Sequence, residues 1–161
     1  MKNTIFVFTL TLLACNSSTR KQDQLTKQID SLEKKIAAAY KPGFGEFMSS
    51  IQVHHNKLWF AGQNQNWKLA EFEMHEIMES FDDIKQYETD RTESQLLGLI
   101  TPAVDSVNFA IQKKDPALFK SSFLFLTNSC NNCHVAAKYA FNIVIVPSSP
   151  PFSNQEFKSI K

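Results

Sequence analysis

Apolar residues recur at helical spacing through four successive stretches of the chain, and this periodicity constrains the fold more than any other feature. The stretches cover approximately residues 45–62, 65–86, 93–114 and 115–142. The second shows the pattern most clearly, with its apolar face formed by Ala70, Met74, Ile77, Phe81 and Ile84. No strand-like alternation occurs before residue 142. Four consecutive helices with short links predict an all-α fold, specifically an antiparallel up-down-up-down four-helix bundle.

Local signals indicate where these helices begin. Asn64 or Asn66 is expected to cap the second helix, because an amide oxygen accepts a hydrogen bond from a free backbone amide there. Asp115 followed by Pro116 predicts the start of the fourth helix. Pro102 should kink or restart the third helix, since proline has no amide hydrogen to donate.

The last residues of the chain do not continue the helical pattern. An apolar run from residue 143 is followed by Pro147, Pro150 and Pro151, which are incompatible with a helix interior. We therefore expect an extended C-terminal tail that packs over the bundle. Phe152 and Phe157 are the expected anchors of that packing.

Between residues 17 and 40 the chain is polar, with a narrow apolar seam at heptad-like spacing. The seam consists of Leu25, Ile29, Leu32 and Ile36. Such a helix is too narrow on its apolar side to join a core, so we expect a helical tether over residues 15–43. With fewer than four heptads a spacer is favoured over a coiled coil, although a homodimer through this seam remains an alternative.

The N-terminus has the pattern of an export signal. Lys2 precedes an apolar run over residues 5–14, which as a helix is about 15 Å long and too short to cross a bilayer core of about 30 Å. The run ends in Leu12-Leu13-Ala14-Cys15, which resembles the lipobox of bacterial lipoproteins. This predicts a signal peptide at residues 1–14 and lipidation of Cys15. The four-helix bundle with its C-terminal extension is expected at residues 44–161. An ordinary secretory signal is the alternative.

Charge and composition exclude several function classes. Seventeen basic residues face sixteen acidic ones, so no strong field attracts nucleic acid. Catalytic triads, phosphate-binding loops and paired acid-base residues are not apparent, which predicts that the chain is not an enzyme.

The motif Cys130-Asn131-Asn132-Cys133-His134 matches the C-x-x-C-H pattern of c-type haem attachment. On a helix these three side chains share one face, so both thiols reach the porphyrin edge while the imidazole turns beneath the iron. We therefore expect haem c as cofactor, with Cys130 and Cys133 as thioether residues and His134 as the proximal iron ligand.

Three other interpretations of the cysteine pair remain. A thioredoxin-like redox pair is typical of a βαβ setting, whereas here a helical apolar face leads into the motif. A structural zinc site usually has a second C-x-x-C, which this sequence lacks. A structural disulfide between Cys130 and Cys133 fits an oxidising compartment.

A helical chain with C-x-x-C-H near the end of its last helix resembles the class II c-type cytochromes, the cytochrome c′ family and its six-coordinate relatives. The resemblance covers about residues 44–142 and is carried by Cys130, Cys133 and His134 together with the helix order. It implies a haem inside the bundle, facing a residue of the first helix. Met48 is the expected sixth iron ligand, and His55, two turns along the same face, is the alternative.

These features predict a membrane-anchored periplasmic cytochrome that transfers single electrons to redox partner proteins. The lipid would attach it to the outer, or the inner, membrane of a Gram-negative bacterium. One alternative is a five-coordinate haem protein that binds nitric oxide or carbon monoxide, because a vacant iron site admits small gases. Another is a haem-free scaffold with a Cys130-Cys133 disulfide.

Overall fold

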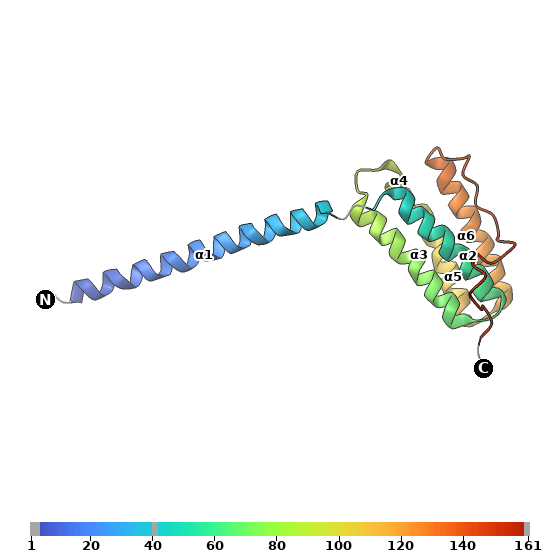
Figure 1. The fold of residues 1–161 in the computed structure, drawn as a ribbon, viewed down its shortest axis with the longest axis horizontal. Coiled ribbons are helices and arrows are strands. Elements are labelled where there is room, and N and C mark those ends of the chain that lie inside the picture. The colour runs from blue at the N-terminus through green and yellow to red at the C-terminus, as the bar shows by residue number, and fades with distance from the viewer. Residues whose placement is uncertain (1–3, 40–41, 160–161) are drawn as a thin grey trace. The chain divides into compact units, whose positions relative to one another are not determined.

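The computed structural model describes the backbone of residues 4–39 and 42–159, and side chains for 20–36, 38 and 42–159. The chain divides into two compact units, Met1–Lys41 and Pro42–Lys161, which are treated separately below. Within the described ranges it forms six α-helices and no strand, so the predicted all-α class is confirmed (Figure 1).

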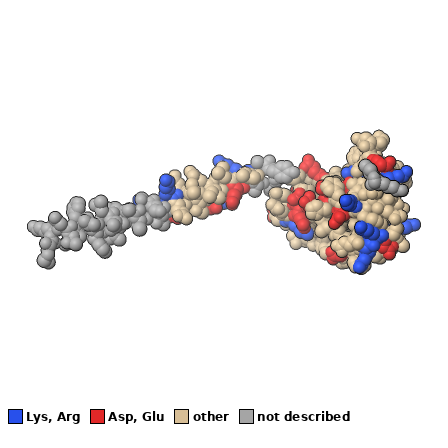
Figure 2. Space-filling view, turned by 90° about the horizontal axis from the view of Figure 1, so that it is seen from below, with Lys and Arg blue, Asp and Glu red and all other residues tan. Residues whose placement is uncertain are grey.

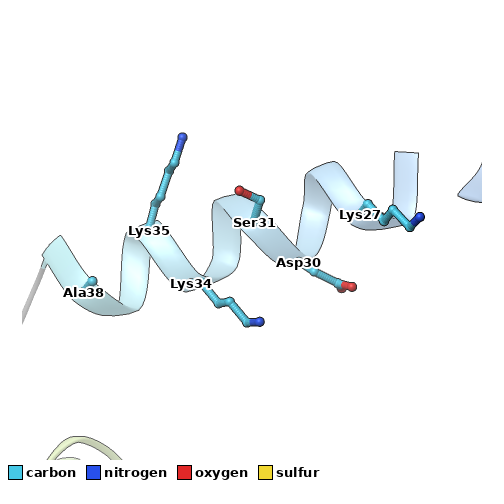
Figure 3. A pocket seen from close by; sticks show the side chains of 6 residues that line it. All are labelled: Lys27, Asp30, Ser31, Lys34, Lys35 and Ala38. Carbon is cyan, nitrogen blue, oxygen red and sulfur yellow. The ribbon is translucent and has the colours of Figure 1, made fainter. Parts of the chain in front are cut away.

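The first unit contains the helix α1 (Thr4–Ala39). The apolar seam expected between residues 25 and 36 is exposed along it, at 49% to 69% of each side chain. Its polar side includes a shallow hollow formed by six exposed residues of α1 alone: Lys27, Asp30, Ser31, Lys34, Lys35 and Ala38 (Figure 3). A hollow built by one helix has no opposing wall and is ordinary surface.

The predicted signal peptide and lipidation site fall mainly outside the described part of the chain. Residues 1–3 are not described, and the side chain of Cys15 lies outside the described residues as well. In the part of the chain that is described, no helix combines the length and the apolar character needed to cross a membrane. Signal peptide and lipidation therefore stay predictions.

The second unit is built from four long helices with a short helical connection. The long helices are α2 (Phe44–Gln63), α3 (Trp67–Tyr87), α5 (Thr101–Lys113) and α6 (Pro116–Ala136). Between α3 and α5 lie α4 (Thr92–Gln95) and a 3-10 helix (Leu97–Leu99). Helix α2 packs against α3 and α6, and α5 packs against α3 and α6. Charged side chains of both signs are mixed over the face shown in Figure 2.

The helix starts follow the sequence signals. Asn66 Oδ1 accepts a hydrogen bond from the Leu69 amide at 3.3 Å, and Asp115 Oδ1 accepts one from the Leu118 amide at 3.0 Å. Pro102 lies in the first turn of α5, where the missing amide hydrogen costs nothing. The third predicted helix is therefore wrong as one element: it consists of α4, the 3-10 helix and α5, and α5 begins beside this proline.

The core is apolar, with one buried carboxylate. Side chains from all four long helices fill it, including Leu58, Met74, Val107 and Phe119. Glu73 of α3 is completely buried and is paired with two residues of α2: its carboxylate lies 2.7 Å from His54 Nδ1 and 3.0 Å from Lys57 Nζ. These contacts connect α2 to α3 through charge as well as through apolar packing.

Beyond α6 the chain runs as a segment without helices or strands. Figure 1 shows it, in dark red, returning along the helical unit. Phe157 is buried, and its ring centroid lies 5.6 Å from that of Phe60. The expected packing of the tail is therefore confirmed for Phe157, whereas Phe152 is exposed.

Gly62, near the end of α2, lies where a side chain cannot fit. A methyl group at this position would overlap the ring of Phe119. We expect Gly62→Ala to lower the free energy of unfolding by about 1–3 kcal/mol, because overpacking displaces the ring. Chemical denaturation measures this. The matched control, Gly45→Ala in the same helix, meets no atom within 4 Å and should not destabilise; equal effects of both substitutions would contradict this account.

Candidate functional site

A cavity of about 810 Å³ lies at one end of the helical unit. It is lined by α2, the end of α3, the α4 region, the end of α6 and the tail. All five haem-site residues predicted from the sequence are among its lining residues: Met48, His55, Cys130, Cys133 and His134. Its volume falls in the range of cofactor-binding pockets, about 300–1,000 Å³.

The two cysteines lie one helical turn apart in α6 and are both free thiols. Cys133 is buried, and its Sγ lies 3.9 Å from the Leu96 carbonyl oxygen. Burial, and secondarily the neighbouring Cys133, raises the pKa of the Cys130 thiol to about 12, and burial also raises the pKa of Cys133. Reactive redox cysteines have lowered pKa values, so this environment is unlike that of a thioredoxin-type pair.

His134 has one ring nitrogen engaged by the chain itself. Its Nδ1 lies 2.6 Å from the carbonyl oxygen of Asn142. A carbonyl oxygen only accepts, so Nδ1 carries the proton and donates it. In the neutral ring Nε2 then holds the lone pair, as a metal ligand requires. The orientation and tautomer of this imidazole are therefore set by a backbone group eight residues farther along.

The tail segment that supplies this carbonyl is held by Asn131. The Asn131 side chain donates to the Val144 carbonyl at 2.9 Å and accepts from the Val144 amide at 2.8 Å. This two-point contact fixes the tail two residues beyond Asn142. The first variable position of the C-x-x-C-H motif thus has a structural role, whereas Asn132, the second, is exposed.

His55 is a buried, neutral residue of the cavity wall. Burial lowers its pKa to about 4. Its Nε2 lies 3.0 Å from the Thr127 hydroxyl oxygen, and that hydroxyl donates to the Phe123 carbonyl. Because the single hydroxyl proton is used there, Thr127 accepts from His55, and Nε2 carries the proton. Only Nδ1 of this ring is then free to accept a hydrogen bond or bind a metal.

Met48 lines the cavity one turn into α2. It is half-buried and packs against the hydrophobic core. Its thioether needs no proton to be displaced before it binds a metal, and it is a known haem ligand type. Both predicted sixth ligands therefore keep a lone pair for a metal, on the Met48 sulfur and on His55 Nδ1.

The rest of the cavity wall fits a large, flat, mainly apolar group. The bundle side provides Ile51, Phe81, Leu97 and Ile100, and the tail provides Ile143, Val144 and Ile145. Ile143 and Ile145 line the cavity while remaining 70% and 69% exposed. A macrocycle bound in this cavity would cover such surface, so the lining, the thiols and the His134 tautomer together fit haem c.

A zinc site is less well supported by the donor set. Structural zinc takes four ligands, usually cysteine and histidine. Across the described ranges, no group of three or more His, Cys, Asp or Glu side chains is placed to hold a metal ion. The motif residues that line the cavity are instead one histidine and two free cysteines, of which Cys133 is buried and Cys130 half-buried.

Several residues of the site were not predicted from the sequence. Arg91, Glu93 and Tyr139 also line the cavity and are linked through Glu93 Oε1, which lies 3.0 Å from Arg91 Nη2 and from Tyr139 Oη. Asn142 acts through its backbone, and a backbone carbonyl leaves no trace in a sequence. Asn131 occupies a variable position of the motif, so the motif does not predict its contact with the tail.

The contact between Asn131 and the tail can be tested by hydrogen exchange. Asn131→Ala removes both hydrogen bonds to Val144, each of which stabilises the contact by about 1 kcal/mol. The backbone amide of Val144 should therefore exchange at least about tenfold faster. Asn132→Ala, one residue away and exposed, serves as the control and should leave that rate unchanged. Equal Val144 exchange in wild type and Asn131→Ala would rule out the contact.

Comparison of the chain with protein-family models, with curated proteins and with solved structures found no match. No relative therefore contributes to the functional assignment. The geometry of the cavity, the two thiols and the oriented imidazole carries the argument for function.

Proposed function

We propose that this chain is a c-type cytochrome with one haem, bonded through Cys130 and Cys133 and coordinated by His134. The observation that carries the proposal is the hydrogen bond from His134 Nδ1 to the Asn142 carbonyl, 2.6 Å long. It leaves the lone pair of Nε2 available to a metal. The same residue lies in one helical turn with two free thiols, and all three residues line an apolar cavity. Oriented imidazoles of this kind are typical of metal-binding histidines.

The helix arrangement supports the proposal. The four long helices, α2, α3, α5 and α6, form in our proposal the up-down-up-down bundle expected of class II c-type cytochromes. Successive helices α2 and α3 pack on each other, as do α5 and α6, and α2 is also in contact with α6. Short links between successive helices favour antiparallel neighbours.

The proposed activity is single-electron transfer without catalysis. The bound iron group would supply the change of one electron. The chain supplies an apolar cavity, a neutral His55 and Met48 as the sixth iron ligand. A thioether ligand raises the haem potential and leaves no vacant iron site for a gas. Redox partner proteins would approach the exposed apolar rim at Ile143 and Ile145.

The proposed location is the periplasmic side of a membrane, with a lipid on Cys15. The lipobox-like sequence before Cys15 supports it. A lipid anchor stabilises membrane attachment by about 0.8 kcal/mol per buried methylene, so acyl chains suffice without a spanning helix.

Haem attachment is tested by expressing the full chain with a c-type maturation system and measuring intact mass and absorption. We expect a mass increase of one haem and a covalent haem spectrum. Replacing both Cys130 and Cys133 with serine should abolish both signals, because no thioether bond can form. Cys15→Ser is the matched control: it should lose the lipid mass and retain the haem. A colourless matured wild type whose mass is that of polypeptide and lipid alone would refute the proposal.

The sixth ligand is tested by reduced-state spectra with and without carbon monoxide. Wild type should be six-coordinate and bind the gas weakly, whereas Met48→Ala should bind it readily, because the sixth iron position is open. Met78→Ala, on α3 and outside the cavity lining, is the control and should behave as wild type. Ready gas binding by wild type would instead favour the five-coordinate gas-binding function, and loss of six-coordination in His55→Ala but not Met48→Ala would assign His55.

A further inference from the structure

The cavity wall contains one permanently charged cation. Arg91 is the only lysine or arginine among the described residues that line it. It precedes α4, and its guanidinium carbon lies 4.9 Å from the centre of the Phe44 ring, at the start of α2. Arg91 is therefore placed where two elements of the wall meet, and its cation is held over an aromatic face.

The guanidinium has more donors than its neighbours use. Its Nη2 donates to Glu93 Oε1 at 3.0 Å. Its Nε is buried, and no described residue accepts a hydrogen bond from it. An arginine has five N–H donors and frequently makes bidentate hydrogen bonds to a carboxylate. An orphaned donor of a charged group is costly, so a ligand that supplies an acceptor at this point is favoured.

Glu93 positions Arg91 without using all of its hydrogen-bond donors. Its Oε1 also accepts from the Tyr139 hydroxyl at 3.0 Å. Hydrogen bonding by Arg91, more than any other cause, lowers the pKa of Glu93, so this carboxylate remains ionised. Glu93 thus connects α4 to the start of the tail, and it orients the guanidinium from one side, whereas Nε has no acceptor among the described residues.

We propose that Arg91 binds the acidic substituents of the cavity's ligand, which on the proposed function are the propionates of haem. The inference rests on that function, because it names the subsite for the charged edge of the same group. Carboxylates are the groups that a guanidinium fork recognises best. Lys57 is a poor candidate by comparison, since it is paired with Glu73 at 3.0 Å and does not line the cavity.

The test compares midpoint potentials of the haem-loaded full chain between pH 4 and 9. In Arg91→Gln the potential should fall, because a cation near the haem disfavours the more positive oxidised state. The midpoint potential rises as a propionate is protonated on acidification. In Arg91→Gln this rise should begin at a higher pH than in wild type, because a propionate without its cation has a higher pKa. The other titratable groups around Arg91, namely Glu88, Glu93 and Tyr139, are present in both proteins.

Two further variants separate binding from fold. Arg91→Lys keeps the cation over Phe44 and the ion pair with Glu93 but has no fork, so the pH profile should shift in the same direction by less. Lys120→Gln, an exposed lysine of α6, is the charge control and should match wild type. Thermal unfolding monitors stability in each protein.

The outcomes distinguish the two proposals. If Arg91→Gln and Arg91→Lys carry haem and their potentials and pH profiles coincide with those of wild type, Arg91 does not bind the propionates, although the cytochrome proposal stands. If Arg91→Gln fails to fold, the profile of Arg91→Lys decides the question alone. If wild type itself carries no haem, both proposals fall.

Discussion

The contact between α2 and α6 determines where this molecule has room for a ligand. At one end the two helices approach closely, because Gly62 has no side chain where the Phe119 ring lies. Midway, His55 of α2 is hydrogen-bonded to Thr127 of α6. Beyond that point the same two helices line the 810 Å³ cavity with Met48 on one and the C-x-x-C-H residues on the other. The close packing of α2 and α6 at Gly62 thus helps to position the other ends of these two helices, which line the cavity.

The environment of the thiols decides which cysteine chemistry fits best. A redox pair requires a thiolate, which needs nearby positive charge or a helix N-terminus. Here the cysteines lie near the C-terminal end of α6, and burial raises the pKa of both. Such thiols remain protonated and unreactive toward disulfides at neutral pH. Conversion to thioethers, as proposed, would remove the ionisation altogether and is compatible with this position.

Much of the helical unit could be predicted from the sequence, because its signals are local. Apolar periodicity gave the long helices, and Asn66, Pro102 and Asp115 mark starts through their own side chains or missing hydrogens. The C-x-x-C-H motif is also a local signal, so it predicted that Cys130, Cys133 and His134 share one site. Residues that act across the fold were not predictable: the partners of Glu73 and the position of Arg91 at the cavity depend on which helices meet. The backbone carbonyl of Asn142 is available in every residue type, so no sequence pattern singles it out.

The order of residues along the chain has a consequence for how the site matures. Both thiols and the imidazole belong to residues 130–134, whereas the carbonyl of Asn142 that orients the imidazole and the Val144 backbone bound by Asn131 come later in the chain. During synthesis, the ring emerges before its orienting group. The orientation of His134 is therefore completed by the final stretch of polypeptide, and a chain truncated just after the motif would retain the thiols and the imidazole without the element that aligns the ring.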